Sequence, residues 1–315
     1  MEPIDIVVTY VNDADPIWRK SFNKYKQEEI RKGIAIKNNK QAFGEERFRD
    51  CDTLKYWFRG VEKNCPWVNK VFLVVWGPSQ VPDWIDTTNP KLRIVYHDEF
   101  IPQELQPVFN SGPIEFYTCR ISDLSKHYIR SNDDNYFINP IPEDMFFRDG
   151  RPVMPDIRRP WKKYTYDNEG AAFWNTFNNN MIIEKDFLNG RDYTYGMGHY
   201  QMPCDKEFEL KIMDKYYNQF FSRFNYSRFR NKHQFSIFLY DNLERLSGNA
   251  IIDSTPYQNN GYWPLKLGLD YNIIKSTRCV CLNDTEFATD HYEEIKKQQL
   301  AFFEELFPNK SSFEK

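Results

Sequence analysis

Two adjacent aspartates, Asp133 and Asp134, separate two apolar segments in the stretch YIRSNDDNYFINP, residues 128–140. Adjacent carboxylates repel each other, and both stay ionised most easily beside a cation. Hard oxygen ligands suit Mg²⁺ or Mn²⁺, which bind through one or two carboxylates together with substrate phosphates. Asn and Asp also favour turns, so a solvated turn is the structural alternative to a metal site.

A second polar cluster, NDAD, contains Asn12, Asp13 and Asp15 near the N-terminus. Because Asp15 precedes Pro16, we expect its side chain to cap a helix that begins at the proline. A helix N-terminus also attracts phosphate groups, so the same residues are candidates for holding a nucleotide.

A third polar cluster, CLND, ends in Asn283 and Asp284. Both side chains offer oxygen atoms that coordinate a metal ion or hold a ribose or phosphate. The structural alternative is again a turn.

Two arginine motifs offer cations for an anionic substrate. The RFRD motif carries Arg47, Arg49 and Asp50 just before an expected helix, and the SRFR motif ends in Arg230. An arginine fork binds phosphate oxygens through two parallel hydrogen bonds. A surface ion pair with Asp50 is the structural alternative for the first motif.

One histidine, His199, follows two glycines in the stretch GMGHY. Glycines let the backbone approach a ligand closely, and a loop histidine is suited to act as a general base or a phosphate donor. A purely structural histidine is the alternative.

Strands that alternate with helices must position these residues. Apolar runs at 4–11, 70–77, 92–100 and 127–134 predict strands. The helices expected between them cover residues 17–32, 52–64 and 113–125. This alternation indicates an α/β fold with a mostly parallel sheet, in which ligands bind at the carboxyl ends of the strands.

The polar clusters stand where these strands end. Residues 12–15, 97–99 and 131–135 each follow an expected strand. Since parallel strands end at the same edge of a sheet, we expect their carboxylates to meet there. Farther along, residues 141–200 are basic and aromatic and read as an insertion over that edge, and 205–247 read as two helices.

The composition excludes some classes of protein. The chain has 315 residues with 42 Lys+Arg and 45 Asp+Glu, so a bulk electrostatic nucleic-acid binder is not expected. The longest apolar runs are too short to span a membrane, and the N-terminus reads as a strand rather than a signal peptide. Six scattered cysteines are expected to be reduced, in a cytosolic protein.

The order of these motifs resembles the Stealth family of sugar-phosphate transferases. The resemblance rests on IDIVVTYVNDAD, RFRD, LKYWFRGVEKNCPWVNKVFLVVWG, VPDWI, IVYHDEFIP, FNSGPIE, HYIRSNDDNYF, GHYQMP and CLND, which span nearly the whole chain. That family includes bacterial hexose-1-phosphate transferases of capsule and cell-wall synthesis and the animal N-acetylglucosamine-1-phosphotransferase.

The resemblance implies a glycosyltransferase-A-like, Rossmann-like fold and a UDP-sugar donor. Hexose-1-phosphate or N-acetylhexosamine-1-phosphate would move to a glycan hydroxyl with release of UMP, with Mg²⁺ or Mn²⁺ as cofactor. The acceptor would be lipid-linked or a growing polysaccharide at the inner face of a bacterial membrane. The basic segment 158–163 is a candidate contact for anionic lipid, and a solvated loop is the alternative.

The resemblance also implies a role for each candidate residue within a single catalytic domain. Its expected sections are a nucleotide-sugar-binding core (1–140), an insertion with a helical acceptor-side lobe (141–275), and a return strand with the C-terminal helix (276–315). The expected catalytic residues are His199 as general base, Arg49 and Arg230 as pyrophosphate clamps, and Asp133 and Asp134. The expected metal ligands are Asp133, Asp134, Asn283 and Asp284. The expected nucleotide-sugar contacts are Asn12, Asp13, Asp15, Asp50, Asn110, Ser111, Glu115 and Arg120.

Three other functions compete with this one. A metal-dependent glycosyltransferase of the same fold would release UDP instead of UMP. A carbohydrate-binding protein without catalysis would account for the aromatic content of 17%. A metal-dependent phosphodiesterase would need a His/Asp cluster for two metal ions, which the sequence lacks.

Overall fold

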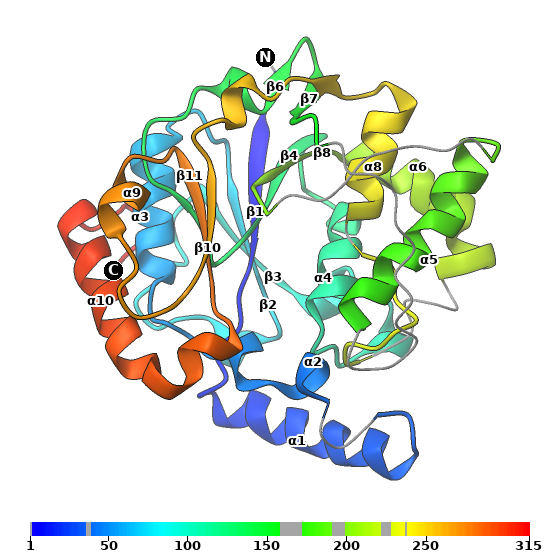
Figure 1. The fold of residues 1–315 in the computed structure, drawn as a ribbon, viewed down its shortest axis with the longest axis horizontal. Coiled ribbons are helices and arrows are strands. Elements are labelled where there is room, and N and C mark those ends of the chain that lie inside the picture. The colour runs from blue at the N-terminus through cyan, green and yellow to red at the C-terminus, as the bar shows by residue number, and fades with distance from the viewer. Residues whose placement is uncertain (1, 36–38, 158–171, 191–198, 222–227, 237) are drawn as a thin grey trace.

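The computed structural model describes residues 2–35, 39–157, 172–190, 199–221, 228–236 and 238–315. A five-stranded sheet with the order β3-β2-β1-β4-β8 runs through its centre (Figure 1). Its strands are β1 (Ile4–Thr9), β2 (Val71–Val75), β3 (Leu92–Tyr96), β4 (His127–Asn132) and β8 (Met202–Asp205). The first four are parallel, and β8 is an antiparallel edge. The order 3-2-1-4 is that of doubly wound nucleotide-binding sheets, so the predicted Rossmann-like α/β class is confirmed.

Helices cover both faces of this sheet, which explains the apolar strands. All five residues of β2 are buried, as are the first five of β1. Strands covered on both faces read as continuous apolar runs rather than alternating ones. In Figure 1, α3, α9 and α10 lie to one side of the sheet and α4, α5, α6 and α8 to the other. Their bounds are α3 (Leu54–Asn64), α4 (Ser111–Phe116), α5 (Ala172–Phe187), α6 (Lys206–Tyr216), α8 (Phe238–Ser247), α9 (Tyr271–Lys275) and α10 (Tyr292–Leu306).

Helices α1 (Pro16–Arg31) and α2 (Lys40–Phe43) lie below the lower end of β1 in Figure 1. The predicted cap is present, because the carboxylate of Asp15 accepts a hydrogen bond from the backbone N–H of Ile17 at 2.8 Å. Trp18 and Phe22 on α1 anchor a second, aromatic core. Its other members are Ala42, Phe48, Phe109 and Phe229. The core holds α1 across the carboxyl ends of the strands, where ligands of such sheets bind.

A smaller sheet determines the surroundings of the adjacent aspartates. It consists of β10 (Gly261–Pro264), β11 (Cys279–Asn283) and β5 (Asn135–Phe137). Strand β5 begins directly after Asp134 and pairs antiparallel with β11, with Asn135 opposite Cys281. The end of β11 is therefore brought beside the two aspartates. A third sheet contains β6 (Phe147–Arg148), β7 (Arg151–Met154) and β9 (Ile251–Ile252).

Two predicted elements are shorter than expected. The strand predicted over 92–100 ends at Tyr96, because the Glu99 carboxylate accepts a hydrogen bond from the Tyr96 backbone N–H at 2.8 Å and starts a helical turn. The helix predicted over 113–125 is the short α4 followed by a 3₁₀ turn. There the Thr118 hydroxyl binds the backbone carbonyl of Glu115, a contact that competes with regular helix bonding.

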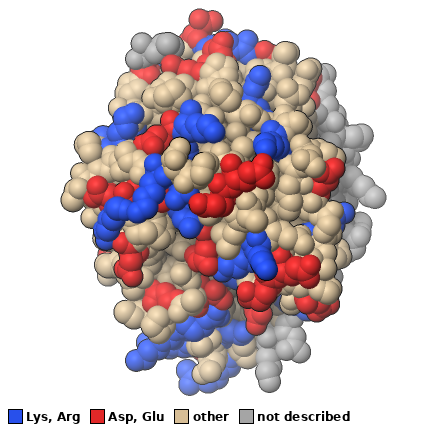
Figure 2. Space-filling model, turned by 90° about the vertical axis from the view of Figure 1, so that its left-hand side faces the viewer, with Lys and Arg blue, Asp and Glu red and all other residues tan. Residues whose placement is uncertain are grey.

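One continuous hydrophobic core draws on the N-terminal, middle and C-terminal parts of the chain, for example through Ile6, Met213 and Val280. In the part of the chain that the structure describes, no helix is both long and apolar enough to cross a membrane. On the face that carries α9 and α10, acidic and basic side chains are interspersed (Figure 2). The basic segment 158–163 lies outside the described residues.

Candidate active site

A cavity of about 790 Å³, here called the central cavity, lies at the carboxyl ends of β1 and β4. Most of the predicted site residues line it. They are Arg49, Asp50, Asn110, Ser111, Glu115, Asp133, Asp134, His199, Arg230, Asn283 and Asp284. Segments from six separate stretches of the sequence therefore meet at the sheet edge where the polar clusters were expected to converge.

The adjacent aspartates form the acidic wall of this cavity, in the short link between β4 and β5. One Asp134 oxygen, Oδ2, accepts hydrogen bonds from the Asn283 amide at 3.0 Å and the Cys281 thiol at 3.5 Å. The other, Oδ1, is buried and has no hydrogen-bond partner among the described residues. Burial raises the pKa of Asp133 well above its ordinary range, and the charges of Asp134 and Asp50 raise it further.

This arrangement fits a divalent cation. Two carboxylates and an unpartnered buried oxygen provide hard oxygen ligands and uncompensated negative charge. No cluster of three or more His, Cys, Asp or Glu ligands occurs in the described ranges. Protein sites hold Mg²⁺ through one or two carboxylates while phosphate and water complete the coordination. Asp133 and Asp134 are the residues that would hold such an ion.

His199 lies beside Asp134, just before β8. Burial lowers the pKa of the imidazole from its ordinary value, and the charge of Asp134 acts in the opposite direction. Its ring packs against Tyr262 of β10, with 4.7 Å between the ring centroids. The Tyr262 hydroxyl in turn donates to Asn283 Oδ1 at 3.3 Å. A neutral imidazole next to a carboxylate can accept a proton, because the carboxylate stabilises the cation that forms.

Arg230 and the start of α4 form another wall of the cavity. Arg230 Nη2 donates to the Ser111 hydroxyl at 3.3 Å. Asn110 caps α4 by accepting from the Gly112 backbone N–H at 3.2 Å, while its own amide nitrogen is buried without a partner among the described residues. Burial raises the pKa of Glu115 to about 7, although the charges of Arg130 and Arg230 oppose the shift. This wall therefore presents hydrogen-bond donors together with one buried carboxyl group.

Arg49 and Asp284 bind each other. Arg49 Nε and Nη2 donate to the two carboxylate oxygens of Asp284 at 2.6 and 2.8 Å, and the guanidinium lies over the Tyr292 ring, 4.3 Å from its centroid. The carboxylate predicted as a metal ligand is thus neutralised by the arginine predicted as a phosphate clamp. The other polar residue of the CLND motif, Asn283, contacts Asp134, because its amide donates a hydrogen bond to that carboxylate.

Because this ion pair is nearly buried, we expect Arg49→Ala to act mainly on stability. Removing one partner of a buried pair leaves an unpaired charge, so the free energy of unfolding should fall by on the order of 3 kcal/mol. Urea unfolding of Arg49→Ala, Asp284→Ala and the double variant measures the coupling between the two side chains. If the losses of the two single variants simply add up in the double variant, the two side chains are not coupled. That result, or an Arg49→Ala variant of full stability with weaker donor binding, would instead support a role of Arg49 in binding phosphate.

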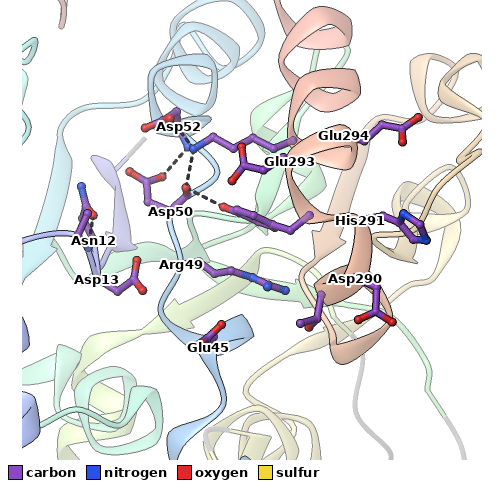
Figure 3. A pocket seen from close by; sticks show the side chains of 14 residues that line it. Asn12, Asp13, Glu45, Arg49, Asp50, Asp52, Asp290, His291, Glu293 and Glu294 are labelled. Atoms are coloured by element: carbon purple, nitrogen blue, oxygen red, sulfur yellow. Dashed lines mark hydrogen bonds and ion pairs between the residues drawn. The ribbon is translucent and has the colours of Figure 1, made fainter.

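A second hollow of about 810 Å³, here called the acidic cleft, opens beside the central cavity (Figure 3). Arg49 and Asp50 line both. Asn12 and Asp13, predicted to hold uridine or ribose, line this cleft at the end of β1, and Figure 3 shows them across it from His291. Its other lining residues are Ala14, Glu45, Asp52, Thr289, Asp290, Tyr292, Glu293, Glu294 and Lys296.

Two predicted site residues line neither hollow. Both oxygens of Asp15 are engaged in structure, since Oδ1 caps α1 and Oδ2 accepts from Ser79 Oγ at 2.6 Å and Gln80 Nε2 at 2.8 Å. Arg120 is exposed, with its guanidinium 5.8 Å from the centroid of the Tyr117 ring. The structure thus supports the helix-capping alternative for Asp15 and keeps Arg120 away from the cavity.

Three residues that line the central cavity are absent from the site residues expected from the sequence: Arg47, Tyr262 and Phe287. Tyr262 and Phe287 expose 43% and 73% of their surface, unusual for large apolar side chains. In a sequence so rich in aromatics, single aromatic residues carry no signal. Arg47 did stand out in RFRD, but the sequence alone did not favour it over Arg49.

Comparisons with known proteins agree with the motif order. The family models "Stealth protein CR2, conserved region 2" and "Stealth protein CR4, conserved region 4" match residues 47–153 and 272–315. Capsular polysaccharide phosphotransferase WcwK of Streptococcus pneumoniae is 31% identical, covering 100% of this chain and 99% of its own. Receptor polysaccharide phosphotransferase WefC of Streptococcus oralis is 30% identical, covering 100% of both chains.

Two further comparisons show a more limited similarity: one relative is matched over only part of its own length, and one solved structure has low sequence identity. Capsular polysaccharide phosphotransferase SacB of Neisseria meningitidis serogroup A is 32% identical over 99% of this chain and 57% of its own. The crystal structure of galactosyltransferase LgtC with donor and acceptor sugar analogs shares 9% identity at a TM-score of 0.38, covering 93% of this chain and 95% of that one. The fold class therefore rests on the strand order of the sheet. The full-length relatives and the two matched regions show that this chain belongs to the Stealth family.

Proposed function

We propose that this protein transfers hexose-1-phosphate, or N-acetylhexosamine-1-phosphate, from a UDP-sugar to a hydroxyl of a glycan and releases UMP. The observation that carries the proposal is the set of side chains that lines the central cavity. Asp133, Asp134 and His199 line this cavity together with Arg230, a cation that forms no ion pair with the described residues. A reaction at the phosphorus of a pyrophosphate needs both, a proton acceptor for the attacking hydroxyl and cations for the phosphoryl oxygens.

In the proposed reaction, the acceptor oxygen attacks the phosphorus that carries the sugar. A new O–P bond forms, the bond from that phosphorus to the oxygen bridging the two phosphates breaks, and UMP leaves with the electron pair. The bond between the sugar C1 and its oxygen stays intact. His199 accepts the proton of the acceptor hydroxyl, and the neighbouring charge of Asp134 favours the imidazolium that results.

Asp133 and Asp134 are proposed to hold Mg²⁺ or Mn²⁺, which when bound would neutralise charge on the pyrophosphate oxygens. Asn283 donates to one oxygen of Asp134, and the other oxygen is buried and has no partner among the described residues, so it is available as a metal ligand. Arg230, whose one described hydrogen bond is to the neutral Ser111 hydroxyl, is free to bind a phosphate oxygen.

The proposal predicts that UMP is the nucleotide product. With purified protein, a set of UDP-sugars, Mg²⁺ or Mn²⁺ and a polysaccharide acceptor, one UDP-sugar should yield UMP in a metal- and acceptor-dependent way. Liquid chromatography of the nucleotides measures this. UDP as the product would favour an ordinary glycosyltransferase, and no turnover with any donor would favour a carbohydrate-binding protein.

The proposed acceptor is a lipid-linked glycan or a growing polysaccharide at the inner face of the bacterial membrane. The polysaccharide phosphotransferase names of the relatives support a polysaccharide as the acceptor. Running the same assay with free oligosaccharide and with the lipid-linked form separates the two acceptors, because the preferred one has the lower KM.

A further inference from the structure

Arg47 precedes Arg49, the arginine predicted from the sequence to bind the pyrophosphate, by two residues, and it lines the central cavity. Both Arg47 and Arg230 line that cavity. Arg47 Nη2 donates to the Gln41 side chain at 3.1 Å, and its Nε is buried without a partner among the described residues. Its one described side-chain partner is therefore a neutral amide.

Four other poorly exposed arginines of this protein bind carboxylates, whereas Arg228 and Arg278 donate to backbone carbonyls. Arg59 pairs with Glu314 through two hydrogen bonds of 2.8 Å, and Arg49 pairs with Asp284 in the same way. Arg130 pairs with Glu209 and Arg245 with Asp241. Arg47 and Arg230, in contrast, have no carboxylate within ion-pair distance in the described part of the chain.

The two unpaired guanidinium groups interact with each other. Burial and the charge of Arg47 lower the pKa of Arg230 to about 9, and the charge of Glu115 acts in the opposite direction. Burial also lowers the pKa of Arg47. Both side chains remain cationic at neutral pH, so the central cavity contains two like charges, neither of which forms an ion pair with a carboxylate of the described residues. Such a pair is unfavourable until an anion binds between or beside the two groups.

Neutral donors accompany the two cations. The Ser111 hydroxyl contacts Arg230, and the buried amide nitrogen of Asn110 has no acceptor among the described residues. The nearby Glu115 forms no ion pair with Arg230 among the described residues; burial raises its pKa to about 7, and the charge of Arg230 opposes that shift. Two guanidinium forks with neutral donors suit a dianion or trianion with several oxygens, which describes a diphosphate better than a single carboxylate.

We propose that Arg47 and Arg230 together hold the diphosphate of the donor, and that Arg49 instead supports the wall through Asp284. The assignment rests on the proposed function for the identity of the donor. It places the diphosphate between these cations and the aspartates that line the same cavity.

Titration calorimetry with UDP as the probe, on the full chain in Mg²⁺ buffer, tests this assignment. A charge-assisted hydrogen bond contributes about 1.5–3 kcal/mol, so Arg47→Gln should weaken UDP binding roughly 10- to 100-fold. Arg47→Lys should restore only part of the loss, because an ammonium lacks the fork. Arg49→Gln, measured below its unfolding temperature, should change the affinity less than Arg47→Gln. The exposed Arg31→Gln is the matched control and should bind as wild type.

Wild-type UDP affinity in a folded Arg47→Gln variant would overturn the assignment, as would a larger loss in Arg49→Gln. Circular dichroism shows whether each variant is folded, and Arg47→Lys provides a second, milder variant. A failure here is distinguishable from a failure of the proposed function. If wild type releases UDP rather than UMP, the reaction is wrong while the diphosphate site can stand.

Discussion

Replacing Asp134 with Asn should lower kcat by about 10²–10³, the loss typical of removing one electrostatic contact to a transition state. The substitution keeps the shape of the side chain and removes the charge that would hold the cation. It also removes the carboxylate beside His199. Steady-state UMP release at saturating donor and several Mg²⁺ concentrations measures the change, and the Mg²⁺ requirement should rise with it.

The thermal stability of Asp134→Asn should stay the same or rise while its kcat falls. A loss of activity caused by the missing charge can therefore be distinguished from a loss caused by unfolding. Burial raises the pKa of Asp134, so its ionised form disfavours the folded state at neutral pH, and a neutral Asn relieves that cost. We expect an unchanged or higher melting temperature for Asp134→Asn. Asp144→Asn, an exposed aspartate outside both hollows, is the control and should keep full activity. Near-wild-type turnover by Asp134→Asn would remove the metal assignment.

Replacing His199 with Gln should lower kcat by about 10²–10⁴, the contribution usual for a general acid or base. Glutamine retains hydrogen-bonding capacity but cannot accept the proton of the acceptor hydroxyl. Because the proposed base acts on the acceptor and not on the donor, UDP affinity should stay close to that of wild type. Single-turnover UMP release and calorimetry with UDP measure the two quantities separately.

A matched control for this variant is His233→Gln, which removes an exposed histidine that lines neither hollow. Its turnover should equal that of wild type. A His199→Gln variant that loses UDP affinity while retaining kcat would reassign the histidine to donor binding. Unchanged kinetics in both variants would exclude His199 from the reaction.

Local sequence patterns were sufficient for most of the sheet. The apolar run of β1, the Asp15–Pro16 helix start and the helix predicted over 52–64 all depend on neighbours in sequence, and the structure confirms each. The strand over 92–100 was predicted too long, because one glutamate side chain starts a turn there and apolar periodicity does not register such a contact.

The candidate site could be predicted only in part. The rule that parallel strands end at one edge correctly brought Asp133 and Asp134 to the ligand side of the sheet. That rule does not predict which side chains of distant segments contact each other. Arg49 and Asp284 are 235 positions apart, and the pairing of β5 with β11 decides that Asn283 contacts Asp134. No local pattern encodes such long-range pairings.

The sequence also could not decide which of two neighbouring arginines, Arg47 or Arg49, is available to bind phosphate. Arg47 and Arg49 share one motif and one chemistry, yet Arg49 finds a carboxylate on the far segment while Arg47 contacts only a neutral amide. Which of two nearby cations stays available for a substrate depends on the rest of the fold. Composition and spacing alone treat them as equivalent.

The most direct test of sugar-1-phosphate transfer follows the phosphorus atom. A UDP-sugar that carries a radioactive label in its β phosphate, the phosphate bonded to the sugar, is incubated with the protein, acceptor and Mg²⁺. Transfer of sugar-1-phosphate predicts that the label appears in the polysaccharide while unlabelled UMP accumulates in equal amount. Label that stays in UDP while the sugar enters the polysaccharide would contradict the account.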